Sequence, residues 1–207
     1  MGPSVITYSG YMGRWEPNAQ ERLVRAALDL FTEQGYDNTT VVQIAERAGL
    51  TKSTFFRHFP DKREVLFAGQ DALCQLLADG IATASGSATP LEAVAVALAN
   101  VAVAFAPERR EFGPQLRAVI AGNRELRERD ALKRAGFAEA IADALQKRDV
   151  PELTASLAGE LGALALKAAY ARWTEPANQQ EFAELARRTL EELQVRITTL
   201  DRQSRDH

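Results

Sequence analysis

The stretch TTVVQIAERAGLTKSTFFRHFPDKREVL, residues 39–66, predicts two short helices and the start of a third. Thr40 and Gln43 have the spacing of a capping box, in which the threonine hydroxyl accepts a backbone N–H and the glutamine side chain reaches back. Gly49 supplies a left-handed residue that ends the first helix. Thr51 then caps the second helix. Two helices joined by a tight, glycine-containing turn form a helix-turn-helix unit.

The second predicted helix separates an apolar side from a polar side. At about 100° per residue, Phe55 and Phe59 lie about 40° apart, and we expect both rings to be buried. Lys52 lies at an angle close to Phe59, but a long side chain in the first turn can swing outward. The outer side combines a cation, a hydroxyl, an aromatic ring and a guanidinium, which suits contacts with phosphates and base edges in a major groove. The residues on that side are Lys52, Ser53, Phe56 and Arg57.

A further helix is predicted to run from Lys62 to about Gly80, capped by Asp61 with Glu64 three residues later. Lys62 then lies at a helix N-terminus, where free N–H groups and the helix dipole favour a phosphate.

These residues together resemble the DNA-binding domain of the tetracycline-repressor (TetR) family, over about the first third of the chain. The matching residues are Leu30-Phe31, Gly35-Tyr36, Thr39-Thr40-Val41, Ile44-Ala45, the run Ala48–Phe59, Lys62 and Leu66. The resemblance implies an all-helical, dimeric repressor with a divergent C-terminal ligand domain. Phe56 departs from the pattern, because the family usually has Tyr there. Phe56 lacks the phenol hydroxyl that makes the family's usual phosphate contact, although its ring can still pack against the sugar-phosphate backbone.

The predicted partner is double-stranded operator DNA, contacted by residues of the helix-turn-helix. His58 has two interpretations, since it can donate to a phosphate beside Arg57 or pack as an imidazole flanking Phe55 and Phe59. The resemblance favours DNA contact. The predicted contact residues are Thr39, Thr40, Thr51, Lys52, Ser53, Thr54, Phe56, Arg57, His58 and Lys62.

The charge composition predicts that only a small part of the chain attracts DNA. The 207-residue chain has a net charge of −3, and its first 66 residues contain eight Lys and Arg against eight Asp and Glu. Only the run 50–63 is basic, with four cations against Asp61. DNA affinity would therefore depend on a small patch that dimerisation doubles.

Other functional classes lack their signatures. Cys74 is the only cysteine, so no intrachain disulfide forms, and in an apolar helical run it is expected to be an inert thiol. His58 and His207 are the only histidines, and there is no phosphate-binding glycine loop or GxSxG motif, so we expect no enzyme, no cofactor and no metal site. The N-terminus does not have the pattern of a signal peptide, and residues 91–106 predict a buried helix rather than a membrane span. The expected location is the cytoplasm.

The fold class is predicted to be all-α, with about nine helices. Residues 1–15 form an arm, in which Arg14 either enters a minor groove or, as we favour, is simply disordered. Residues 16–66 form the helix-turn-helix domain and residues 67–207 a helical ligand-binding and dimerisation domain. The predicted helices run from Pro17 to Gly35, through the two short helices and 62–80, and then over 91–106, 116–122, 124–148, 151–173 and 178–200.

The last two predicted helices, 151–173 and 178–200, are apolar at i, i+3 and i+4, and the first is rich in Gly and Ala, which allow close helix approach. They can close the core of a monomer, or form a four-helix bundle with a second chain, as the resemblance implies. The expected homodimer interface contains Leu161, Ala165, Ala168, Ala171, Leu190, Leu193 and Ile197.

Candidate ligand-binding residues lie on the helices between 91 and 173. Spacing alone makes most of them core residues, and the resemblance implies that some line an apolar cavity. They are Phe105, Phe112, Leu116, Arg117, Ile120, Phe137 and Tyr170. The FFRHF run followed by PDKREVLF also resembles an actinobacterial subgroup related to mycofactocin-type regulators, thought to bind acyl-CoA-like ligands.

The expected function is a one-component transcriptional regulator, released from a palindromic operator by a small apolar or amphipathic effector. One alternative is an effector-independent or architectural DNA-binding protein, which a well-formed apolar cavity would count against. Another is an enzyme or carrier on the same fold, which would need an acid/base cluster in the pocket.

Overall fold

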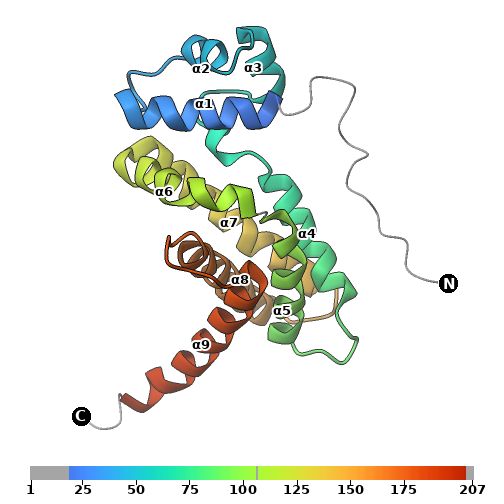
Figure 1. The fold of residues 1–207 in the computed structure, drawn as a ribbon. Helices are drawn as coiled ribbons and strands as arrows, with labels where there is room; N and C mark the ends of the chain where they lie inside the picture. Colours follow the sequence, from blue (N-terminus) through green and yellow to red (C-terminus); the bar gives the residue numbers. More distant parts are fainter. Residues whose placement is uncertain (1–18, 106, 204–207) are drawn as a thin grey trace, which may run out of the picture. The chain divides into compact units, whose positions relative to one another are not determined.

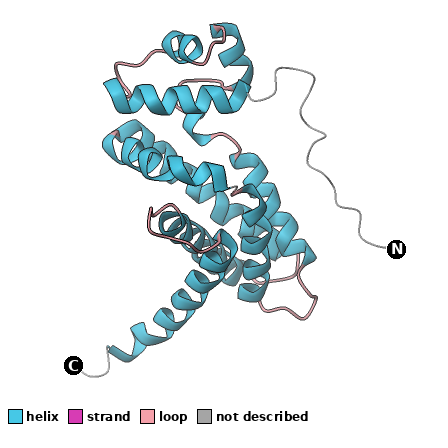
Figure 2. Cartoon of the chain, viewed as in Figure 1, coloured by secondary structure: helices cyan, strands magenta, loops and turns pink. Residues whose placement is uncertain are grey.

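The computed structural model describes residues 19–105 and 107–203 of the chain (Figure 1). Within these ranges the regular elements are nine α-helices and three short 3₁₀ segments, with no strand (Figure 2). The all-α fold class is confirmed. The chain divides into two compact units, Met1–Ala68 and Gly69–His207. The predicted arm over 1–15, with Arg14, and the helix start at Pro17 lie outside the described residues.

The N-terminal unit packs three α-helices and one 3₁₀ segment around a small apolar core. The elements are α1 (Ala19–Gln34), α2 (Val41–Arg47), α3 (Lys52–His58) and η2 (Glu64–Phe67). One stripe of α1, spaced at i, i+4 and i+7, is buried through Leu23, Ala27 and Leu30. Gly35 ends α1 with a φ of 86°, as predicted. Helix α1 packs against α2 and η2, and α3 in turn packs against α2.

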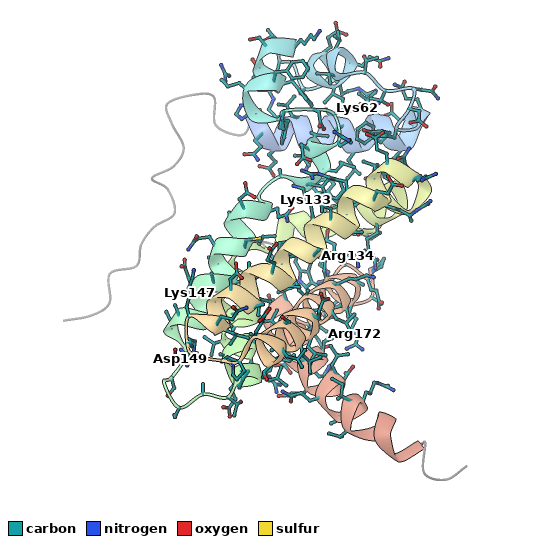
Figure 3. The ribbon with its side chains drawn as sticks, turned by 180° about the vertical axis from the view of Figure 1, so that it is seen from behind. Lys62, Lys133, Arg134, Lys147, Asp149 and Arg172 are labelled. Carbon is teal, nitrogen blue, oxygen red and sulfur yellow. The ribbon has the colours of Figure 1, made fainter. Side chains whose placement is uncertain are left out.

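The C-terminal unit contains the remaining elements. They are α4 (Gln70–Thr83), α5 (Pro90–Val101), η3 (Ala102–Ala104), η4 (Pro107–Phe112), α6 (Gly113–Gly122), α7 (Arg124–Gln146), α8 (Glu152–Trp173) and α9 (Phe182–Gln203). One apolar core receives buried residues from α4, α5, α7, α8 and α9. Arg172 of α8, labelled in Figure 3, ties α8 to α9: its guanidinium donates to Thr189 Oγ1 at 3.1 Å and to Glu192 Oε2 at 2.7 Å.

The predicted continuous helix over 62–80 is wrong. Ala68 leaves the helical region with a ψ of 141°, and Gly69 adopts a left-handed φ of 82°, which glycine tolerates because it lacks a Cβ. A short 3₁₀ segment therefore precedes this break, and α4 begins at Gln70 and continues to Thr83.

Other helix ends differ by smaller amounts. The helix predicted over 91–106 ends as an α-helix at Val101, and that predicted over 116–122 already begins at Gly113. The last helix begins at Phe182 instead of residue 178, because Asn178 forms a turn: its side-chain oxygen accepts from Gln180 N at 3.0 Å. The helices predicted over 124–148 and 151–173 are observed over Arg124–Gln146 and Glu152–Trp173.

Residues Glu64–Thr83 are long and apolar enough to cross a membrane by length and composition alone. The segment is broken at Gly69, and α4 itself has 14 residues, fewer than the about 20 that a spanning helix needs. Leu77 and Ile81 are buried in the core of the C-terminal unit. We therefore interpret α4 as a core helix.

Candidate DNA interface

The turn between α2 and α3 is held by local capping bonds. At the start of α2, Gln43 N donates to Thr40 Oγ1 at 3.2 Å and Thr40 N donates to Gln43 Oε1 at 2.8 Å. At its end, Gly49 has a φ of 65° and Leu50 N donates to Ala45 O at 2.8 Å, the pattern of a Schellman motif. The predicted capping box and left-handed glycine are both confirmed.

Arg22 of α1 also holds this turn, from the other side. Its guanidinium donates to the carbonyl oxygens of Ala48 and Gly49. A Cβ added at Gly49 would lie 2.8 Å from Arg22 Nη2. Glycine is favoured here by its left-handed backbone, and a Cβ would in addition make the end of the Arg22 side chain shift.

The helix α3 is anchored by its two predicted apolar residues. Phe55 is 0% exposed and Phe59 is 3% exposed, and their ring centroids lie 5.4 Å apart. Thr51 caps the helix by accepting from Thr54 N at 3.1 Å. Because these contacts hold one side of α3 in the core, the opposite side is presented to solvent.

The solvent side of α3 carries the four chemical groups that the sequence predicts there. Lys52, Ser53, Phe56 and Arg57 are all exposed. The ammonium of Lys52 lies 5.8 Å from the centroid of the Phe56 ring. This face therefore combines donors for phosphates and base edges with an apolar ring.

The four threonines in the predicted contact set have structural roles in the N-terminal unit. Thr39 is a correction: it is 1% exposed and its hydroxyl donates to Gly35 O at 2.8 Å, so its side chain cannot reach DNA. Thr40 and Thr51 are exposed but serve as N-caps. Thr54 is half-buried, with its hydroxyl 3.0 Å from that of Thr51.

Lys62 is not at a helix N-terminus, because η2 begins only at Glu64. Its ammonium donates to Tyr36 O and Thr39 O, each at 2.8 Å, and lies 4.0 Å from the centre of the Tyr36 ring. Figure 3 labels this side chain. Lys62 thus holds the turn that precedes α2, and its contact with phosphate stays a prediction.

Asp61 does not cap a helix at Lys62 as predicted, but it holds the turn that precedes η2. Its Oδ1 accepts from Arg63 N at 2.8 Å and from Glu64 N at 3.1 Å. The hydrogen bond from the Arg63 side chain, followed by those backbone bonds, lowers the pKa of the Asp61 carboxyl.

His58 is half-buried, and its Nε2 atom is buried without a hydrogen-bond partner. Burial first, and then the charge of Arg57, lowers the pKa of this imidazole. A neutral ring is therefore favoured, and any phosphate contact would have to use Nδ1. The packed interpretation of His58 fits this geometry better than donation through Nε2.

Comparison with known proteins now identifies the N-terminal unit. Residues 23–68 match the sequence pattern of the family described as bacterial regulatory proteins, tetR family. This segment of the chain matches the TetR family. The chain is also 38% identical, over 82 residues, to the HTH-type transcriptional regulator TcmR of Streptomyces glaucescens. That match covers 40% of this chain and 36% of TcmR, so the chain spans about a third of this relative's length.

Solved structures extend the likeness to the fold around the TetR-family domain. NalD, the secondary repressor of the MexAB-OprM multidrug efflux pump in Pseudomonas aeruginosa, is 17% identical with a TM-score of 0.54, covering 84% of this chain and 94% of NalD. FadR from Bacillus subtilis, solved in complex with stearoyl-CoA, is 18% identical with a TM-score of 0.52, covering 83% and 95%. At these identities the likeness shows the fold alone.

The seven candidate ligand residues beyond the TetR-family domain are all half-buried. Phe105 stacks on Phe182 with ring centroids 3.8 Å apart, and the rings of Tyr170 and Trp173 lie within 6.1 Å of a neighbouring ring in the same cluster. Arg117 donates to Ala171 O at 3.1 Å. Burial raises the pKa of the Tyr170 phenol, and the charge of Arg117 opposes this rise. Phe112, Leu116, Ile120 and Phe137 complete the predicted set.

The sequence predicts two of the four rings in this aromatic cluster, Phe105 and Tyr170. Trp173 and Phe182 are not among the predicted ligand-binding residues. A shallow, open depression of about 380 Å³ lies elsewhere, between α5 and α9. Its lining residues are Ala95, Val96, Ala99, Ala183, Glu184 and Arg187, none of which was predicted. Among the described residues, no group of three or more His, Cys, Asp or Glu side chains is placed to hold a metal ion.

Two of the seven predicted dimer-interface residues need correction. Ala165 is 0% exposed and Leu190 is 2% exposed in the single chain, because both belong to the core of their own C-terminal unit. Leu161, Ala168, Ala171 and Leu193 are half-buried, and Ile197 is 40% exposed.

The outer side of α8 instead exposes three leucines. Leu153 is 83% exposed, Leu157 58% and Leu164 45%. With Leu161 they span about 80° of the helix, and we call these four residues the α8 leucine stripe. Glu160 lies at the edge of the stripe. Spacing at i, i+4 and i+8 was the signal that could have identified Leu153 and Leu157.

Proposed function

We propose that this chain is a one-component transcriptional repressor of the cytoplasm, which binds a palindromic operator as a homodimer and is released by a small ligand. The observation that carries the proposal is the exposed face of α3, where Lys52, Ser53, Phe56 and Arg57 stand together on a helix anchored by two buried rings. That face can enter a major groove, with its cations on phosphates or guanine edges.

The α8 leucine stripe supports the homodimer. Exposed apolar side chains aligned along one helix are favoured to bury against a second helix, and a two-fold dimer uses the same surface on both subunits. Ile197 of α9 is also exposed and can extend this surface. A dimer doubles the few basic groups of α3, which a chain with net charge −3 needs for useful affinity.

Selection from a pool of random DNA duplexes tests the proposal. The protein should enrich an inverted repeat whose half-site centres lie about 10 base pairs apart, or a multiple of that spacing, because two recognition helices must reach successive major grooves. Enrichment of a site without repeat symmetry would contradict the dimeric mode. The absence of any enriched sequence would contradict the proposed function as a whole.

The proposed ligand is apolar or amphipathic and binds in the C-terminal unit. The aromatic cluster of Phe105, Tyr170, Trp173 and Phe182, with Arg117 beside Tyr170, supports this class, because rings suit an apolar body and a guanidinium suits an anionic group. A long-chain acyl-CoA is the first compound to test. The same compound tests the proposed relation to mycofactocin-type regulators.

Reciprocity gives a direct test of the ligand response. A ligand shifts DNA binding only by its differential affinity for two states, with a coupling of typically about 1–3 kcal/mol. We therefore expect an acyl-CoA to lower operator affinity about 5- to 150-fold without dissociating the dimer, and operator DNA to weaken acyl-CoA binding by the same factor. Calorimetric titration of free and operator-bound protein measures both. Equal acyl-CoA affinity in the two states would remove this mechanism.

An effector-independent regulator is the second candidate, and one contact favours it. The ring centroids of Phe105 and Phe182 lie 3.8 Å apart in a stacked pair. The two rings could line a cavity, but here they pack against each other and leave no space between them. The same titration separates the candidates: an effector-independent protein would bind its operator with unchanged affinity across a panel of apolar and acyl ligands.

A further inference from the structure

Phe56 is unusual among the aromatic residues of this chain. It is 47% exposed, and it is the only exposed aromatic side chain among the residues whose side chains the structure describes. Only two large apolar side chains in the described part of the N-terminal unit are exposed, Val42 on α2 and Phe56 on α3. Of the two, Phe56 lies on α3, the helix whose exposed face is proposed to enter the major groove, whereas Val42 lies on α2.

The ring of Phe56 is held in place rather than loosely exposed. It meets the buried Phe55 ring edge-on, with centroids 5.5 Å apart and planes at 80°. The Lys52 ammonium lies 5.8 Å from its centroid. A ring supported by a buried neighbour loses little further freedom on binding, so its contact with DNA is pre-organised.

The chemistry of Phe56 restricts what the ring can recognise. It has no hydroxyl, so it cannot form the phosphate hydrogen bond that a tyrosine would make. In the major groove, the C5-methyl group of thymine is the apolar feature that distinguishes one base from another, and phenylalanine is among the side chains that contact it.

We propose that Phe56 reads the C5-methyl group of one thymine in each operator half-site. This inference rests on the proposed function, because it assumes that α3 enters the major groove. It makes Phe56 a determinant of operator sequence, in addition to the polar groups of the same face.

Lys52 limits where that thymine lies. Successive bases along a strand are about 3.4 Å apart, and the Lys52 ammonium is 5.8 Å from the Phe56 ring. The two side chains therefore reach the same base pair or pairs within about two steps of each other. Because lysine prefers the O6 and N7 acceptors of guanine, each half-site should combine a guanine with a nearby thymine.

Replacement of thymine by deoxyuridine tests this, because the change removes only the methyl group. Each thymine of the operator obtained by selection is replaced in turn, symmetrically in both half-sites, and affinity is measured at fixed salt. We expect one position to lose about three- to fivefold per half-site, the loss from exposing one buried methyl group. Lys52→Ala should relax sequence preference within two base pairs of that position.

Variants of Phe56 assign the effect to the ring. Phe56→Ala should bind the thymine operator more weakly and show no loss at the sensitive position when deoxyuridine is introduced. Phe56→Tyr keeps the ring and should keep the sensitivity. Val42→Ala, at the other exposed apolar residue, is the matched control and should leave the deoxyuridine profile unchanged.

Two other outcomes overturn the inference while leaving operator binding intact. If the wild-type protein and Phe56→Ala have the same deoxyuridine profile, the ring does not read a methyl group. If Phe56→Ala weakens binding equally to all sequences, the ring packs against the sugar-phosphate backbone instead. Failure of the proposed function would look different, because the wild-type protein would then enrich no operator. Thermal unfolding confirms that each variant is folded.

Discussion

Replacing Leu157 by Asp is expected to convert the proposed homodimer into a monomer. Leu157 lies in the α8 leucine stripe and is 58% exposed in the single chain, so the substitution does not disturb its own core. A two-fold interface contains the new charge twice, and each unpaired carboxylate in a dry contact costs several kcal/mol. A loss of about 4 kcal/mol would raise the dimer dissociation constant about a thousandfold. Sedimentation at micromolar concentration measures the change.

Loss of the dimer in Leu157→Asp should also lower the affinity for operator DNA. A monomer contacts only one half-site and about half of the phosphates, so we expect affinity for the full palindrome to drop by at least about a hundredfold. Circular dichroism should show unchanged helix content, because the monomer keeps its own core.

Leu132→Asp provides the matched control. Leu132 lies on α7, is 62% exposed and is outside the α8 leucine stripe. This variant should remain a dimer with normal operator affinity. If Leu132→Asp dissociated the dimer and Leu157→Asp did not, the interface would have to be moved from α8 to α7.

The helix ends in the N-terminal unit were predictable because the residues that hydrogen-bond to each other there are close in sequence. The capping box of Thr40 and Gln43, the left-handed Gly49 and the cap at Thr51 each depend on neighbours within a few positions. The burial of Phe55 and Phe59 followed from helical period alone.

Contacts between distant positions were not predictable in the same way. The ammonium of Lys62 reaches carbonyls 23 and 26 residues earlier in the chain, and no spacing rule indicates such a bond. Thr39 has a hydroxyl that could contact DNA, and the sequence alone does not show that it is buried. Its burial depends on how the turn after α1 folds against the rest of the unit.

Helical period also could not show which face of α8 packs against the core and which faces solvent. Leu and Ala occur almost all round this helix, so the pattern could not separate Ala165, which faces the core, from Leu157, which faces solvent. The break at Gly69 was missed for a related reason, since a single glycine within an apolar run can be either tolerated in a helix or left-handed.

The close packing of α7 against α8 leads to the second large expected effect, a loss of stability in Gly159→Ala. A Cβ at Gly159 would lie 2.4 Å from Ala138 O and 3.2 Å from Ala138 C, both backbone atoms of α7. Backbone cannot rotate away as a side chain can, so the two helices must separate.

The expected cost of Gly159→Ala is about 2–3 kcal/mol. Overpacking a close contact costs about 1–3 kcal/mol, and separating two long helices places this site at the upper end of that range. The gain in helix propensity from Gly to Ala offsets at most about 1 kcal/mol. For a chain of this size the midpoint of thermal unfolding should fall by about 5–10 °C. Unfolding can be followed by the fluorescence of Trp173, in the core of the same unit, in a Trp15→Phe background.

Alanine substitutions at two further glycines of the C-terminal unit provide a comparison for the stability loss in Gly159→Ala. A Cβ at Gly162 would meet two side chains, Ile141 Cδ1 at 2.7 Å and Val94 Cγ1 at 3.0 Å. Because side chains can shift or change rotamer and backbone cannot, Gly162→Ala should destabilise less than Gly159→Ala. A Cβ at Gly122 meets nothing within 4 Å, so Gly122→Ala should change stability by no more than about 0.5 kcal/mol. The order of the three variants is the test. A Gly159→Ala protein as stable as the Gly122→Ala protein would mean that α7 and α8 are not in backbone contact at this crossing.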